Sequence, residues 1–210
     1  YGLSHEMLDH DGEHFKYKDV PMELRPLQEP FPPIWYPSSN PEVATIIGES
    51  GYHFVTLGAT ETAKVSVDNY KTGYAKRSAP LRPSDDFPGG TAIGISRHVV
   101  VADTMDDALK IAHPAYERWH HSLVKLWVDN KAQGPAFTRS IKSGLTSAIE
   151  AGTDIVGDPD HVAAEITRQV EELGVNYMIC QFYFGDMTHE SAMRSLDLFK
   201  TEVMPKVAHL

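Results

Sequence analysis

Residues 24–51, LRPLQEPFPPIWYPSSNPEVATIIGESG, encode a short apolar strand that passes through a polar turn directly into a helix. Closely spaced prolines keep the approach extended, and Ile34-Trp35-Tyr36 has strand-favouring side chains. Asn40 is a good N-cap, Pro41 suits the first helical position, and Gly51 follows as a stop signal. This unit predicts an α/β protein rather than an all-helical or all-strand one.

The turn Pro37-Ser38-Ser39-Asn40 is a candidate anion site because it lies at the N-terminus of the predicted helix. Free backbone amides and the helix dipole favour negative charge there, and a phosphate is the expected ligand. Short polar turns of this kind are common in α/β proteins, so an ordinary helix cap is the alternative interpretation.

The strand-then-helix order is repeated along the chain. Strands are predicted near residues 33–36, 53–57, 95–102 and 176–183, and the main helices near 41–50, 60–76, 104–125 and 188–204. A further helix near 159–173 begins after Asp158 and ends before Gly174. The run 95–102 is apolar enough to be buried on both faces, as in a parallel sheet. We therefore expect four parallel strands in sequence order, with helices on one side.

Two connections interrupt this order. Residues 77–90 contain three prolines, two glycines and four charges, which predicts a surface loop. Residues 128–156 form a longer connection with a weakly helical stretch at 137–149, and are either a lid or a solvated insertion. We expect 134–152 to be less ordered, or to lie at the mouth of the fold or in an assembly contact.

Composition excludes several classes of protein. The net charge of −10 argues against binding to nucleic acid and to an anionic membrane surface. No apolar run approaches the about 20 residues of a membrane span, and no secretory signal is visible. Cys180 is the only cysteine, so an internal disulfide is excluded and a reducing, cytoplasmic location is expected. Its apolar neighbours indicate a buried, inert thiol.

The histidines do not form a metal-binding pattern. His5 and His10 are five residues apart rather than four, and His120 and His121 are adjacent on a predicted helix. We therefore predict no metal site. His98 lies on a strand and points either to the interior or to the helical layer; a structural role is the default and a ligand pocket the alternative. Nucleophile-elbow, P-loop, HExxH and CxxC motifs are absent.

Two strand ends are candidates for ligand contact. Gly58 follows the second predicted strand and allows close approach of a ring system, although glycine is also a common turn residue. The aromatic run 182–184 follows the last strand, at the end where barrel enzymes place their chemistry. These side chains either wall a ligand or belong to the core.

Several segments in series resemble the bacterial-luciferase-like flavin monooxygenases. They are the run RPLQEPFPPIWYPSSNPEVATIIGESG, Gly89-Gly90-Thr91 leading into GISRHVVVADTMDDALKIA, then VGDPDHVAAEITRQVEELGVNYMICQFYFGDM, and MRSLDLFKTEVMPKV. The resemblance implies a (β/α)8 TIM barrel, of which this chain supplies about the last four βα units. Residues 1–210 would be the C-terminal portion of one barrel domain, with the first half absent. Alternatively, the half barrel is itself the naturally occurring protein and closes by pairing with a second chain.

The resemblance also implies a function. Reduced FMN, supplied by a separate flavin reductase, would react with dioxygen to oxidise a small organic substrate. The protein would form a homo- or hetero-oligomer. The FMN phosphate would lie at Tyr36, Ser38, Ser39 and Asn40, held mainly by backbone amides and the serine hydroxyls. Catalytic residues stay unassigned, and the fragment alone would be inactive, because the flavin-facing histidine of the family is in the first half. The alternatives are an F420-dependent hydride-transfer enzyme and a catalytically silent flavin-binding or partner subunit.

Overall fold

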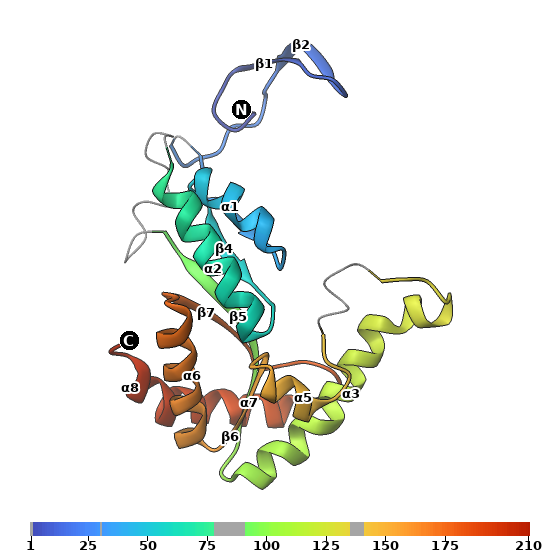
Figure 1. The fold of residues 1–210 in the computed structure, drawn as a ribbon, viewed down its shortest axis with the longest axis vertical. Coiled ribbons are helices and arrows are strands. Elements are labelled where there is room, and N and C mark those ends of the chain that lie inside the picture. Colours follow the sequence, from blue (N-terminus) through green and yellow to red (C-terminus); the bar gives the residue numbers. More distant parts are fainter. Residues whose placement is uncertain (1, 30, 78–90, 135–140) are drawn as a thin grey trace.

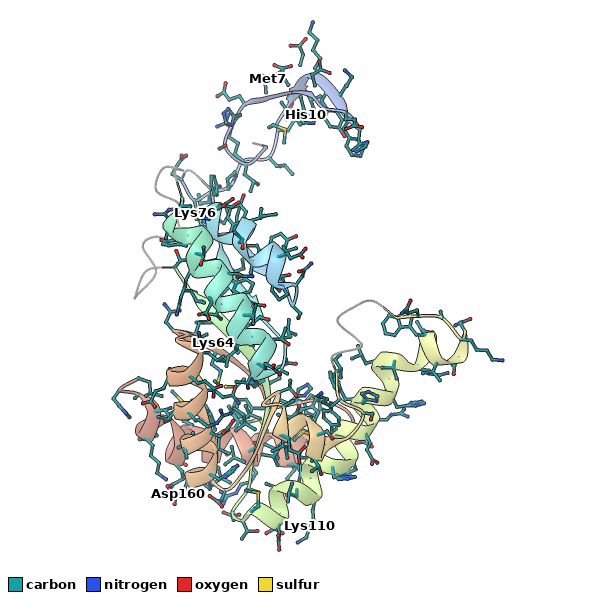
Figure 2. The ribbon with its side chains drawn as sticks, viewed as in Figure 1. Met7, His10, Lys64, Lys76, Lys110 and Asp160 are labelled. Atoms are coloured by element: carbon teal, nitrogen blue, oxygen red, sulfur yellow. The ribbon has the colours of Figure 1, made fainter. Side chains whose placement is uncertain are left out.

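The computed structural model describes residues 2–29, 31–77, 91–134 and 141–210. The chain begins with an antiparallel hairpin of β1 (Met7–Asp11) and β2 (Lys16–Pro21), which extends away from the helices (Figure 1). Met7 and His10 on this hairpin lie far from the rest of the protein (Figure 2). The surface loop predicted for 77–90 lies, apart from Arg77, outside the described residues. No described helix is long and apolar enough to cross a membrane.

The main sheet confirms the predicted parallel order. β3 (Trp35–Pro37), β4 (His53–Thr56), β5 (Ile93–Val101) and β7 (Tyr177–Gln181) follow one another in sequence order, and each neighbouring pair is parallel. A fifth strand, β6 (Asp154–Gly157), was not predicted. It pairs with the C-terminal half of β5, on the edge where β4 has already ended. Its four residues are too few to show a period of two within a long connection.

Three of the predicted helices have bounds within one residue of those in the structure. α1 (Pro41–Glu49) is capped by the Asn40 side chain, and α2 (Thr60–Ala75) follows β4. α6 (Pro159–Leu173) is capped by Asp158 and ends at Gly174, which has a φ of 61°. α7 (His189–Leu198) continues through a single π-helical turn (Phe199–Val203) into α8 (Met204–Val207), so the helix predicted at 188–204 is not regular throughout.

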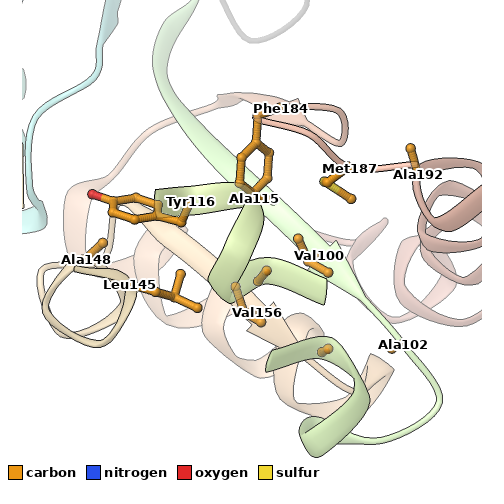
Figure 3. Packing of buried hydrophobic residues seen from close by; sticks show 12 residues of the cluster. Val100, Ala102, Ala115, Tyr116, Leu145, Ala148, Val156, Phe184, Met187 and Ala192 are labelled. Carbon is orange, nitrogen blue, oxygen red and sulfur yellow. The ribbon is translucent and has the colours of Figure 1, made fainter. Parts of the chain in front are cut away.

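The prediction that all helices cover one side of the sheet was wrong for the third unit. α3 (Met105–Asp129) and α5 (Leu145–Glu150) pack against Val100 and Val156 in one cluster (Figure 3). Val99, Val101 and Ile155 instead pack against α6, α7 and the C-terminal helical turns. Because side chains alternate along a strand, these are opposite faces of β5 and β6. The helices α3 and α5 therefore cover the second face of the sheet at its C-terminal end.

Cys180 on β7 is half-buried against α6 and the C-terminal helical segment. Burial raises the pKa of this thiol from 9.0 to about 11.

We expect alkylation of Cys180 by iodoacetamide near neutral pH to be about 100-fold slower than in the urea-unfolded chain, because the thiolate fraction falls tenfold per pKa unit. Mass spectrometry of reactions quenched at successive times gives the alkylation rates of the folded and unfolded chain, and hence their ratio. Since the folded-state pKa is the higher one, this group makes the fold less stable as pH rises from 9 towards 11. Equal alkylation rates in both states would contradict the assignment.

Candidate functional site

A cavity of about 480 Å³ opens at the C-terminal ends of the parallel strands, within the size range of small-molecule sites. The turns after β3 and β4 form one side, and α3 forms the opposite side. The lining residues are Pro37, Ser38, Ser39, Leu57, Ala59, Ser96, His98, Tyr116, Trp119, Leu123, Ile141, Thr153, Asp154 and Gln181. The C-terminal edge of a parallel sheet is where α/β proteins bind ligands, because the connecting loops converge there.

The polar floor of the cavity comes from the middle of the sheet. Ser96 and His98 are two residues apart on β5 and therefore share a face, and Gln181 ends the adjacent strand β7. The Gln181 amide Nε2 donates to Ser96 Oγ over 2.7 Å. This leaves the Ser96 hydroxyl proton and the Gln181 carbonyl oxygen as a donor and an acceptor for a ligand.

His98 forms a buried pair with Asp154, the first residue of β6. The distance from His98 Nδ1 to Asp154 Oδ1 is 3.0 Å, and Thr153 Oγ1 donates to Asp154 Oδ2 over 2.9 Å. Both carboxylate oxygens are thus in use, and the carboxylate is 2% exposed. The imidazole ring stacks on Phe184 with centroids 4.1 Å apart, and Trp119 packs edge-on at 4.5 Å. The sequence left two orientations open for His98, and the structure places it towards the cavity.

The cavity wall on the side of α3 is apolar and aromatic. Tyr116, Trp119 and Leu123 lie one turn apart on this helix and face the cavity together. The Tyr116 hydroxyl donates to the Lys142 carbonyl over 2.6 Å, and burial, with a smaller contribution from Asp154, raises its pKa far above the usual value of 10.0. Figure 3 shows Tyr116 beside Leu145 and Ala148 of α5. Tyr116 is therefore a neutral wall residue that fixes the 141–144 segment to α3.

The predicted phosphate turn reaches the cavity through two of its four candidate residues. Ser38 and Ser39 line it. Tyr36 does not, because it alternates with Pro37 along β3 and faces the other way, with 46% of its surface exposed. The Asn40 side chain caps α1 by accepting from the Glu42 amide over 2.9 Å.

Most backbone amides of this turn are already used. The Ser38 amide donates to the Val55 carbonyl over 2.9 Å, and the Asn40 amide donates to Ser38 Oγ over 3.1 Å. Proline has no amide proton, which removes Pro37 and Pro41 as donors. The donors available to an anion are therefore the Ser39 amide, the two serine hydroxyls and the Val43 amide in the first turn of α1. The prediction that backbone amides and the serine hydroxyls share the phosphate would therefore rest mainly on the hydroxyls of Ser38 and Ser39.

Arg97 supports the site from the other face of β5. It is 1% exposed; its Nε donates to Gln169 Oε1 over 2.8 Å, and its Nη1 donates to the carbonyls of Gly58 and Ser96 over 3.1 and 2.9 Å. Burial lowers its pKa to about 10, although the charge of Asp154 acts in the opposite direction. Arg97 thus ties the turn after β4, which lines the cavity, to β5 and α6.

Other sequence hypotheses have different outcomes. Leu57 and Ala59, on either side of Gly58, line the cavity, whereas Gly58 serves as an acceptor for Arg97. Of the aromatics after β7, Phe182 packs in the core, Phe184 stacks on His98, and Tyr183 is 66% exposed. No cluster of three or more metal-ligating side chains occurs in the described ranges. Asp154, Tyr116 and Trp119 were not predicted as site residues.

A family model described as luciferase-like monooxygenase matches residues 2–177. The chain belongs to this family. An uncharacterized protein, y4wF of Sinorhizobium fredii, is 28% identical over 200 residues, which cover 95% of this chain and 56% of that protein. The chain thus spans about half the length of the curated relative it matches.

Several solved structures share the fold of this chain. The FMN-bound oxygenating constituent of 3,6-diketocamphane monooxygenase from Pseudomonas putida is 20% identical with a TM-score of 0.61, covering 95% of this chain and 54% of that one. The F420-dependent tetrahydromethanopterin reductase of Methanopyrus kandleri is 16% identical with a TM-score of 0.62, covering 98% and 59%. The luciferase-like chain is an α/β protein of the TIM-barrel family that corresponds to about half of such a barrel, as the sequence predicts.

Proposed function

We propose that this chain forms part of the FMN site of a flavin-dependent monooxygenase that oxidises a small organic substrate with dioxygen. The observation that carries this proposal is a cavity in which a serine turn at a helix N-terminus faces an aromatic wall. A flavin has the matching parts, a terminal phosphate and a flat apolar ring. The family match and the similarity to an FMN-bound oxygenating constituent support this assignment.

The residues present fit FMN in chemistry. Ser38 and Ser39 would hold the phosphate through their hydroxyls and the Ser39 amide, assisted by the positive end of the α1 dipole. Leu57 and Ala59 would contact the ring from the turn after β4, and Trp119 would exclude water from the opposite side. When bound, the flavin supplies the redox chemistry with dioxygen, while the protein binds, orients and shields it.

The proposed site extends beyond this half of the barrel. In the described part of the chain, no lysine or arginine lines the cavity, so a phosphate there needs a cation from elsewhere. An open apolar groove continues along the same sheet face and is lined by Trp35, Pro37, Val55, Leu57, Ser96, Tyr177 and Ile179. We propose that the remaining βα units of the barrel, in the same or a second chain, cover this groove and supply the cation, and that a flavin reductase supplies reduced FMN.

Replacing both Ser38 and Ser39 by alanine tests the phosphate site. We expect FMN binding to weaken by about 1–3 kcal/mol, because hydrogen bonds from hydroxyls to a charged group are lost. Fluorescence titration of the full-length protein with FMN measures the change. Ser50→Ala, at the other end of α1, is the matched control and should leave the dissociation constant unchanged. An unchanged constant in the double variant, with folding intact, would place the phosphate elsewhere and leave this turn as a helix cap.

An F420-dependent hydride transfer is the second candidate function, because the chain has a comparable TM-score to an F420-dependent reductase. Parallel titrations with FMN and F420 separate the two. Tighter binding of F420, with hydride transfer to or from a substrate, would replace the monooxygenase proposal. Binding of FMN without oxygen-dependent turnover would indicate a catalytically silent subunit.

A further inference from the structure

The His98 imidazole has one nitrogen committed to the protein and one available to the cavity. Nδ1 is hydrogen-bonded to Asp154, whereas no described residue hydrogen-bonds Nε2. In the described ranges, the fully buried side-chain atoms without a hydrogen-bond partner are on Thr60, Ser66 and Arg97. His98 Nε2 has no partner in these ranges and is not in this set, so it retains some exposed surface. Because His98 lines the cavity, the exposed part of the ring faces the ligand space.

The partners of His98 fix its tautomer. An ionised carboxylate only accepts hydrogen bonds, so Asp154 requires the proton of the neutral imidazole to be on Nδ1. Nε2 is then the unprotonated nitrogen, an acceptor and a base. Thr153 binds the second carboxylate oxygen, and Phe184 and Trp119 restrict the ring. Such a preorganised acceptor needs little rearrangement when a proton donor binds.

We propose that His98 Nε2 accepts the hydroxyl proton of the substrate, and that the substrate is a small, neutral phenol-like or alcohol-like compound. This inference rests on the proposed function and names the substrate class of the same cavity. Asp154 and Thr153 are positioning residues, since they act through the imidazole.

The walls of the cavity support this class of substrate. Tyr116, Trp119, Leu123 and Leu57 present mainly apolar surface, which suits a carbon ring or chain. The polar groups at the floor are neutral or, in Asp154, acidic, so this end of the cavity favours an uncharged hydroxyl group over a carboxylate or phosphate. Ser96 and Gln181 offer a further donor and acceptor at the same end of the cavity.

The proton transfer is balanced within these groups. The O–H bond of the substrate breaks, its electron pair stays on the substrate oxygen, and a new N–H bond forms at Nε2. The imidazolium cation produced lies 3.0 Å from the Asp154 carboxylate, which compensates its charge. The oxyanion is more electron-rich than the hydroxyl and is therefore the more readily oxidised form of the substrate.

The test compares 4-fluorophenol with its methyl ether, 4-fluoroanisole, in fluorine NMR titrations of the full-length protein near neutral pH. The ether carries a methyl group in place of the hydroxyl proton, and both probes have the same fluorinated ring. We expect the wild type to bind the phenol about tenfold more tightly than the ether, the value of one good hydrogen bond. In His98→Asn, whose amide keeps a donor towards Asp154, the preference should fall to less than about twofold.

A second variant tests positioning. In Asp154→Asn the side-chain amide donates to Nδ1, so we expect the imidazole proton to move to Nε2 and the phenol preference to disappear. Nitrogen NMR of the His98 ring reads this tautomer change, which loss of packing alone would not produce. His113→Gln, an exposed histidine on α3, is the matched control and should keep the tenfold preference.

The wild type also gives a direct measurement, in case a variant fails to fold. Its Nε2 resonance should shift when the phenol is added and stay in place with the ether. Equal binding of both probes by the wild type, or an unchanged preference in a folded His98→Asn, would overturn the proposal. FMN titration of the wild-type sample separates this from the proposed function, because FMN binding tests the FMN site and the phenol preference tests His98. If the wild type does not bind FMN, the proposed FMN site is rejected. The comparison of phenol with ether still tests the role of His98.

Discussion

Replacing Gly73 by alanine is expected to destabilise the fold by about 3 kcal/mol or more. Gly73 of α2 lies against α1 so closely that an added Cβ would be 2.1 Å from the Thr45 carbonyl oxygen. The same crossing brings Gly48 of α1 to the backbone of α2, where a Cβ would be 2.2 Å from the Tyr70 oxygen. Backbone atoms on both sides leave no flexible side chain to move aside.

The sign of this effect is informative because helix propensity acts the other way. Alanine is favoured over glycine inside a helix by about 1 kcal/mol, so the clash must exceed that gain. Urea unfolding followed by circular dichroism measures the difference. Gly144→Ala is the matched control, because an added Cβ there has no atom within 4 Å, and its cost as an N-cap should stay below about 1 kcal/mol. A Gly73→Ala protein as stable as the wild type would show that the two helices separate at little cost.

Replacing Arg97 by methionine is expected to cost about 2–4 kcal/mol of unfolding free energy. The change removes the donor for Gln169 Oε1 and for the Gly58 and Ser96 carbonyls, all in the buried interior. Removing a desolvated cation returns part of that loss, because burial already lowers the Arg97 pKa to about 10. The unpaired acceptors dominate, since one substitution affects three hydrogen bonds.

Urea unfolding measures this loss, and Arg118→Met on the exposed surface of α3 is the control, expected within about 0.5 kcal/mol of the wild type. The unfolding free energy of Arg97→Lys should lie between those of Arg97→Met and the wild type. Lysine keeps the positive charge but lacks the planar set of donors of the guanidinium group. We also expect Arg97→Met to weaken FMN binding, since the turn after β4 loses its anchor to β5. Equal stability of the Arg97→Met and wild-type proteins would show that water satisfies the three acceptors.

The sequence determined the elements whose signals are local. The N-caps Asn40 and Asp158 and the stop at Gly174 set helix bounds that the structure confirms within one or two residues. The apolar run of β5 predicted a buried parallel strand, and the turn predicted before α1 lies at the cavity, where phosphate binding stays a prediction. These features depend on capping, backbone preference and period, which nearby residues decide.

Tertiary structure decided which distant residues form the cavity. Asp154 meets His98 only because β6 pairs with the second half of β5, and a four-residue strand gives no pattern for that pairing. Likewise, the sequence of α3 predicts an amphipathic helix that covers the same sheet face as the other helices. Packing against Val100 and Val156 instead places α3 on the opposite face from α6, and Trp119 lines the cavity there. The amphipathic pattern of a helix states that one face is buried but not which sheet face receives it. That choice is made by long-range packing, and it creates the site.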